Sequence, residues 1–268
     1  MSDSGTTQRY LVSLASTISG WDKPQEKLHQ AFAENEFILF GQSILRLLPR
    51  GNKKPHFEVF VRLQEEEKQL VPPGTFLPML EYYNLGPRLD RYVVNALLNS
   101  FGKKRPEDWG VAHLNLCATT FADKDFCPFV SEELAKKGAP ADCLCFEFPG
   151  KESAFPAAAQ VLAEDLKKIG CRVSVGAVED DSIGFKPIKE LRADFLKIGG
   201  KLIRELLTNP AAAAEIKTAA RVCKSFDVQT IAQYVELAPT LTLLRQNDID
   251  FAQGYGISKP APLASVTK

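Results

Sequence analysis

The sequence predicts an α/β fold built as a barrel of parallel strands surrounded by helices. Short apolar runs alternate with helix-like stretches from residue 73 onward, which is typical of strands joined by crossover helices. The chain has 268 residues, of which 45% are hydrophobic, enough for one large domain with a sizeable core. Its eight candidate strands match a closed TIM-like (β/α)8 barrel better than an open sheet.

The start of the chain departs from this alternation. A helical segment at residues 24–34 precedes two apolar runs, at residues 36–48 and 57–63, that predict the first two strands. Only a turn with Pro and Gly, residues 49–55, separates them. Because a connection this short holds no crossover helix, we expect one antiparallel strand near the start of the barrel.

The regular part of the chain follows. Further strands are expected at residues 112–117, 143–148, 172–178, 194–198, 229–232 and 251–255. Helices are expected at residues 73–83, 89–101, 126–137, 155–169, 211–226 and 239–246.

Composition narrows the classes of function. Lys+Arg and Asp+Glu both number 33 and no basic stripe stands apart, so neither wrapping of a nucleic-acid polymer nor coating of a membrane is expected. The six cysteines include no C-x-x-C pair, which predicts reduced thiols. No signal sequence and no run of roughly eighteen apolar residues is visible, so a cytoplasmic location without membrane insertion is expected.

Polar residues interrupt or close the apolar runs of five predicted strands. They are Asn115, Glu147, Lys197, Gln233 with Glu236, and Gln253. A single polar residue at a strand end usually reaches solvent or caps a turn. Five strands with the same feature predict side chains that converge on one mouth of the barrel, where ligands bind.

The second strand adds a charged pair. Glu58 and Arg62 are four residues apart, so they share a face of the strand with Phe60 between them. A guanidinium beside an aromatic ring suits a flat, anionic ligand such as a nucleotide. The alternative is that Glu58 and Arg62 neutralise each other inside the barrel.

At this point the chain resembles an EAL domain, the TIM-like fold of cyclic di-GMP phosphodiesterases, over residues 27–264. Residues 58–62, Glu-Val-Phe-Val-Arg, stand where that family has its signature Glu-Ala-Leu-Leu-Arg. The other segments that resemble the family, in order and at its usual intervals, are residues 36–44, 76–81, 115–117, 147, 195–198, 231–236 and 252–260. The resemblance implies a barrel of the EAL type at residues 27–268, preceded by a helical extension at residues 1–26.

The strand ends and the resemblance together predict a nucleotide site for cyclic di-GMP. Its expected residues are Gln42, Glu58, Phe60, Arg62, Asn115, Glu147, Lys197, Glu236, Gln253, Gly254 and Pro260. Gln42 resembles the ligand-binding glutamine of the family's first strand.

Other positions depart from the family. Active members place two adjacent aspartates, which bind divalent metals, where this chain has Gly176 and Ala177. Gly199 and Gln233 likewise replace an Asp and a Glu of the family pattern. Glycine and alanine supply no side-chain ligand, so we expect no metal site, no required cofactor and no catalytic residue.

Asp180 and Asp181 are nearby carboxylates that could replace the missing pair. Such a replacement requires the loop to shift against the unbroken spacing to Lys197, which argues against it.

The resemblance therefore implies a degenerate EAL domain that is not an enzyme. Its expected function is that of a non-hydrolysing cyclic di-GMP receptor that passes nucleotide binding to a protein partner, and a homodimer is compatible with this role. One alternative is a nucleotide-independent interaction module, favoured by the unusual loop at residues 179–189. The other is a weak residual phosphodiesterase.

Overall fold

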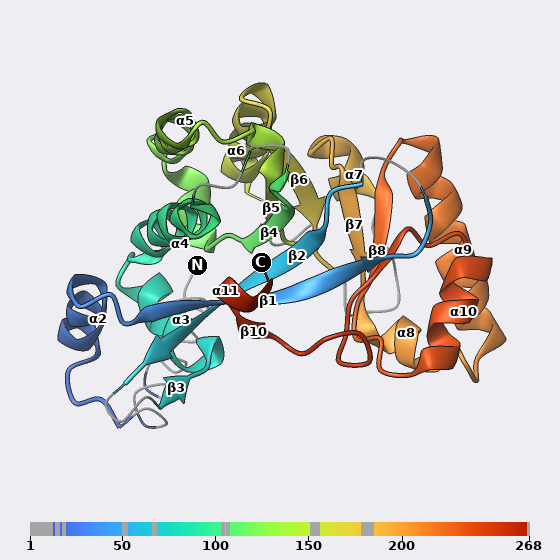
Figure 1. The fold of residues 1–268 in the computed structure, drawn as a ribbon, viewed down its shortest axis with the longest axis horizontal. Helices are drawn as coiled ribbons and strands as arrows, with labels where there is room; N and C mark the ends of the chain where they lie inside the picture. The colour runs from blue at the N-terminus through green and yellow to red at the C-terminus, as the bar shows by residue number, and fades with distance from the viewer. Residues whose placement is uncertain are drawn as a thin grey trace.

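The computed structural model describes residues 13, 17, 20–49, 53–65, 69–102, 105, 108–150, 156–177 and 185–266. Eight of the strands close into one barrel, which confirms the predicted fold (Figure 1). These strands are β1 (Phe37–Arg46), β2 (His56–Gln64), β4 (Val111–Asn115), β5 (Leu144–Phe148), β6 (Arg172–Val175), β7 (Phe195–Ile198), β8 (Gln229–Ala232) and β9 (Phe251–Ala252).

The first strand is the antiparallel one. β1 pairs antiparallel with β2 from Phe37 opposite Leu63 to Ile44 opposite His56, and antiparallel with β9 on its other edge. From β2 through β9 the barrel strands run parallel. The predicted antiparallel strand is thus confirmed, and it closes the barrel because it pairs with both the first and the last parallel strand.

Helices surround the strands. They are α2 (Pro24–Ala33), α3 (Pro73–Tyr82), α4 (Gly86–Phe101), α5 (Phe126–Lys137), α6 (Ala157–Lys168), α7 (Lys186–Glu190), α8 (Gly200–Glu205), α9 (Pro210–Ser225), α10 (Ala238–Gln246) and α11 (Leu263–Val266). Figure 1 shows α4, α5 and α6 on one side of the barrel and α8, α9 and α10 on the other. The described part of the chain contains no helix with the length and apolarity that a bilayer crossing requires.

Apolar helix faces pack against the outside of the strands. Leu97 of α4 and Leu166 of α6 are fully buried in one cluster with Phe146 of β5. Ile216 of α9 and Leu244 of α10 are fully buried in a second cluster around β8. Burial of this kind supplies most of the stability of short amphipathic helices.

The sequence missed the shortest elements. These are the two-residue strands β3 (Leu70–Val71) and β10 (Ala261–Pro262), the 3₁₀ helices Ala118–Ala122 and Ala141–Cys143, and the helices α8 and α11. Elements of six residues or fewer show too little periodicity to be recognised. The extension predicted over residues 1–26 lies mostly outside the described residues.

The predicted strand at residues 251–255 is shorter than expected, because β9 ends at Ala252. The chain turns after Gln253, and a Cβ atom placed on Gly254 would lie only 2.2 Å from the backbone nitrogen of Val235. This close approach joins the loops that follow β8 and β9, and it needs a glycine.

Alternation along the strands builds two layers inside the barrel. One interior layer is apolar and contains Ile44, Val111, Cys145, Phe195, Ile231 and Phe251. Residues two positions further along several of these strands form the next layer, which includes Glu147, Lys197 and Gln253. The period of two therefore places polar side chains directly above an apolar floor.

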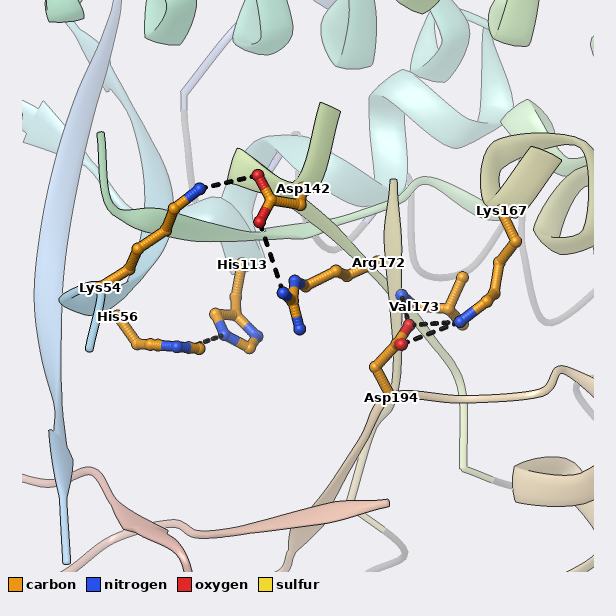
Figure 2. A network of polar contacts seen from close by, with 8 residues as sticks. All are labelled: Lys54, His56, His113, Asp142, Lys167, Arg172, Val173 and Asp194. Carbon is orange, nitrogen blue, oxygen red and sulfur yellow. Dashed lines mark hydrogen bonds and ion pairs between the residues drawn. The ribbon is translucent and has the colours of Figure 1, made fainter. Parts of the chain in front are cut away.

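Two histidines interrupt the apolar layer (Figure 2). His56 Nδ1 lies 3.2 Å from His113 Nε2, and both rings are buried. Burial and the cations Arg46, Arg172 and Lys54 lower the pKa of His56 to about 3. Burial likewise lowers the pKa of His113 well below its ordinary value. Both histidines are therefore neutral in the folded protein at neutral pH.

Ion pairs surround this histidine pair at the end of the barrel opposite the mouth. Asp142 accepts from Lys54 at 2.7 Å and from Arg172 at 3.4 Å, as Figure 2 shows. Asp194 lies 2.8 Å from Lys167 Nζ and accepts from the backbone nitrogen of Val173 at 2.8 Å. These contacts connect the starts of neighbouring strands around the histidines.

The histidine pair predicts an acid-sensitive fold. Below pH 6.5 an unfolded chain binds protons that the folded protein excludes from His56 and His113, so stability falls as pH drops from 6.5 toward 3. Each of the two buried histidines should lower the unfolding free energy by about 1 kcal/mol when the pH falls from 7 to 5.5. Urea unfolding of wild type and of His56→Gln at the two pH values measures this, with the variant losing about 1 kcal/mol less.

The exposed His29 offers a matched control. Between pH 7 and pH 5.5, the His29→Gln variant should lose as much unfolding free energy as the wild type. Burial raises the pKa of Asp90 to about 7, so this carboxyl group makes the folded protein more stable as the pH falls. The effect is the same in the wild type and the variants and cancels in the comparison. Equal losses in wild type and His56→Gln would contradict the prediction.

Candidate functional site

A cavity of about 770 Å³ opens at the carboxyl ends of the parallel strands. All of the predicted site residues except Lys197 line it: Gln42, Glu58, Phe60, Arg62, Asn115, Glu147, Glu236, Gln253, Gly254 and Pro260. The structure therefore brings together side chains from both halves of the chain. A cavity of this volume suits a ligand of nucleotide or dinucleotide size.

Lys197 lies beneath the cavity and is 1% exposed. Its ammonium is 2.9 Å from Glu58 Oε2 and also forms an ion pair with Glu147. Burial alone would lower the pKa of Lys197, but the negative charges of Glu147 and Glu58 raise it above its ordinary value. A single buried cation is thus shared by two carboxylates from different strands.

The two carboxylates have different electrostatic environments. Burial would raise the pKa of Glu58, but Lys197 and hydrogen bonds from Asn115 and Gln253 hold it below its ordinary value. Burial raises the pKa of Glu147, with a smaller contribution from the charge of Glu58, although Lys197 acts in the opposite direction. Glu58 is therefore the firmly ionised partner of the lysine.

Side-chain amides complete the contacts of Glu58. Asn115 Nδ2 donates to Glu58 Oε1 at 2.8 Å, and Gln253 Nε2 donates to Glu58 Oε2 at 2.8 Å. Gln253 Nε2 also lies 3.0 Å from Gln42 Oε1, and Gln42 Nε2 donates to the carbonyl of Ser258 at 2.8 Å. This network holds the three strands β1, β2 and β4 and the loop after β9 in one arrangement.

Arg62 does not take part in that network. Its guanidinium lies 5.8 Å from the ring centroid of Phe60 and 5.9 Å from that of Phe40. None of the ion pairs formed among the described residues involves Arg62. The alternative of a self-neutralising Glu58–Arg62 pair is therefore wrong, because Lys197 neutralises Glu58 and leaves the guanidinium to face the cavity.

Gly176 and Ala177 line the cavity at the end of β6. A Cβ atom placed on Gly176 would lie 2.9 Å from Glu147 Oε1, so the carboxylate of Glu147 fills the space beside this glycine. Asp180 and Asp181, proposed as shifted replacements, lie outside the described residues.

The carboxylates of Glu58 and Glu147 already have partners among the described side chains. In the ranges that the structure describes, no three His, Cys, Asp or Glu side chains converge as a metal-binding group. Lys197 forms ion pairs with both Glu58 and Glu147, and Glu58 also accepts hydrogen bonds from two amides. Ions such as Mg²⁺ are coordinated by several oxygen atoms, including those of carboxylates.

Two aromatic residues at the rim of the cavity were not predicted from the sequence. Tyr234 and Tyr255 both line the cavity and are 57% and 64% exposed. Each follows a polar residue at the end of a predicted strand, by one or two positions. This closeness to the strand ends was the only sign in the sequence that the two tyrosines lie at the cavity. Exposed tyrosines in loops are common, so the sign was too weak for a prediction.

Residues 25–260 match the sequence profile of the EAL domain. This match spans most of the chain, beginning in α2 and ending after β9. The chain belongs to the EAL domain family. The resemblance drawn from the strand ends is thereby confirmed at the level of the family.

Curated relatives of this EAL domain include cyclic di-GMP phosphodiesterases. PdeB of Shewanella oneidensis is 28% identical over 245 residues, which cover 89% of this chain and 28% of that protein. PdeF of Escherichia coli is 28% identical over 241 residues, covering 88% of this chain and 32% of that protein. The chain thus spans less than a third of the length of these relatives.

Solved structures share the fold. The EAL domain of FimX from Pseudomonas aeruginosa, solved bound to c-di-GMP, has a TM-score of 0.79 at 23% identity, covering 89% of this chain and 96% of that one. The EAL domain of FimX from Xanthomonas citri, in complex with c-diGMP, also has a TM-score of 0.79, at 22% identity, covering 91% of this chain and 95% of that one. The barrel of this EAL domain is therefore of the EAL type.

The relatives contradict one expectation, that this EAL domain is not an enzyme. Proteins similar along most of its length are named cyclic di-GMP phosphodiesterases, which points to activity rather than inactivity. That expectation took the absence of carboxylates at four positions, Gly176, Ala177, Gly199 and Gln233, to mean that the reaction is lost. Glu58, Glu147 and Glu236 still place carboxylates at the cavity.

The buried lysine predicts a strong effect on stability. Lys197→Met should lower the free energy of unfolding by about 3–5 kcal/mol, because it leaves Glu58 and Glu147 buried without a counter-ion. Urea unfolding monitored by circular dichroism measures the change. The exposed Lys124 provides the control, and Lys124→Met should change stability by no more than about 0.5 kcal/mol. Equal stability of the two variants would rule out Lys197 as the electrostatic centre of the mouth.

Proposed function

We propose that this EAL domain binds cyclic di-GMP in the cavity at the barrel mouth. The observation that carries the proposal is the Arg62 guanidinium, which faces the cavity beside Phe60 and pairs with no carboxylate among the described residues. Cyclic di-GMP offers two phosphates for a guanidinium and two purine rings for aromatic contact. Arginine recognises phosphate through charge-assisted, directional hydrogen bonds.

The electrostatics of the mouth support an anionic ligand. Two unpaired carboxylates in this position would repel phosphate, but Lys197 lies within ion-pair distance of both Glu58 and Glu147. Asn115 and Gln253 further stabilise the charge of Glu58 through their amide groups. Lys197 therefore offsets part of the negative charge beneath the cavity, and Arg62 adds a second positive charge at the cavity.

Proteins with the same fold give independent support. The FimX EAL domain and the phosphodiesterase PaMucR were both solved with c-di-GMP bound. This chain shares their barrel and places Gln42, Glu58, Arg62 and Gln253 at its mouth.

For the fate of the bound nucleotide, the relatives point to phosphodiester hydrolysis. A regulatory role, in which nucleotide binding changes the contact with a protein partner, is the second candidate. It is favoured by Leu237, an apolar side chain that is 57% exposed in the loop after β8, close in sequence to the cavity residues Tyr234 and Glu236. A partner bound at Leu237 would lie close in sequence to the cavity lining, so that a nucleotide in the cavity would alter its contact.

We propose further that nucleotide binding requires no divalent metal, since no metal-binding group is present among the described residues. Titration calorimetry with cyclic di-GMP should give the same affinity in EDTA and in magnesium. Chromatography of the nucleotide after incubation then assigns its fate, because a linear product identifies hydrolysis and an intact nucleotide identifies the regulatory role. Absence of heat in both buffers contradicts the proposed binding.

Arg62→Ala should weaken cyclic di-GMP binding roughly tenfold or more, because a charge-assisted contact to phosphate is worth about 1.5–3 kcal/mol. The exposed Arg221 of α9 offers a matched control, and Arg221→Ala should leave the affinity unchanged. Calorimetry on both variants measures the difference. An Arg62→Ala protein that binds as tightly as the wild type would mean that the ligand does not use this cavity.

A further inference from the structure

Tyr234 is an unusual residue for its backbone conformation. Its φ angle is +58°, in the left-handed region that glycine and asparagine adopt far more readily than an aromatic residue. The other non-glycine residues that the structure describes with positive φ are Asn35, Asn84, Arg192, Asp227 and Asp248. Tyr234 is thus the one aromatic residue among them, and its local conformation is unfavourable unless the surroundings compensate.

Neighbouring groups hold the Tyr234 ring in place. A Cβ atom placed on Gly200 would lie 2.6 Å from Tyr234 Cδ2, so the ring rests directly on the backbone at the start of α8. The Arg204 guanidinium, one turn further along α8, lies 5.9 Å from the ring centroid. The contacts with Gly200 and Arg204 orient the ring. A residue larger than glycine at position 200 would displace it.

The rest of the ring remains available. Tyr234 is 57% exposed and lines the cavity, so the surface not covered by Gly200 and Arg204 faces ligand and solvent. Large aromatic side chains of soluble proteins are usually buried or have one covered face. A ring fixed on one side and open on the other, at the edge of a nucleotide-sized cavity, is arranged as a stacking platform.

The loops at this edge are rigidly joined. Val235 N donates to the carbonyl of Gln253 at 2.9 Å, and Gly256 N donates to the carbonyl of Val235 at 3.0 Å. These bonds connect the loop of Tyr234 with the loop of Tyr255 across the ends of β8 and β9. The platform is therefore held by backbone contacts and needs little ordering when a ligand binds.

We propose that Tyr234 positions the ligand by stacking its ring on one guanine base of cyclic di-GMP at the rim of the cavity. This inference rests on the proposed function and assigns a role to a residue outside the predicted site. Arg62 holds a phosphate in the interior of the cavity while Tyr234 supports a base at its edge. With a φ angle of +58°, the Tyr234 side chain lies at the lining of the cavity.

Three substitutions test the proposal. Tyr234→Gly should weaken cyclic di-GMP binding about tenfold, the range expected for loss of one base–aromatic stack. Its thermal unfolding temperature should stay equal to that of the wild type or rise, because glycine adopts a positive φ angle without steric cost. Tyr234→Phe should keep the affinity of the wild type. In Tyr234→Trp, the indole fluorescence should be quenched by the nucleotide more than the signal of Trp21 and Trp109 in the wild type.

The outcomes separate this inference from the function on which it rests. Wild-type binding with unchanged affinity in Tyr234→Gly and no quenching in Tyr234→Trp overturns the stacking role and leaves the proposed function intact. No binding by the wild type rejects both. As a matched control, Tyr82→Ala removes another partly exposed tyrosine that does not line the cavity, and it should leave the affinity unchanged.

Discussion

The mouth of this EAL domain depends on one buried ammonium group. Lys197 lies between Glu58 and Glu147, on strands that are not neighbours of β7 in the barrel. Neither carboxylate could remain ionised at such depth without a counter-charge, since desolvation of an unpaired charge costs several kcal/mol. Lys197 keeps Glu58 ionised, and Asn115 and Gln253 donate hydrogen bonds to its carboxylate. Arg62 lies outside this network.

The same arrangement limits what else the site can hold. Glu147 occupies the space beside Gly176, where a side chain would meet its carboxylate. Relatives named as cyclic di-GMP phosphodiesterases are 28% identical to this chain along most of its length, whereas the described side chains form no group of three His, Cys, Asp or Glu residues that could hold a metal. Binding of a nucleotide and cleavage of a phosphodiester make separate demands on a site.

Much of the fold was predictable because it follows from local periodicity. The alternation of strands and helices from residue 73 onward, the antiparallel first strand and the polar strand ends all appear in the structure. Elements of two to six residues, such as β3 and α8, were not predictable, because their pairing and packing depend on partners distant in sequence. The same limit applies to Tyr234, whose position over Gly200 exists only once α8 is packed beside the loop after β8.

What the sequence by itself determined is the set of side chains that face the mouth. A period of two along each strand forces Glu147 to lie above Cys145, and Lys197 above Phe195, whatever the rest of the chain does. Only the tertiary structure decided which of these groups pair. Glu58 could have been neutralised by Arg62 on its own strand, yet closure of the barrel brings Lys197 to 2.9 Å from it. The physical reason is that a salt bridge depends on distance and burial, and both are set by closure of the barrel rather than by spacing along the chain.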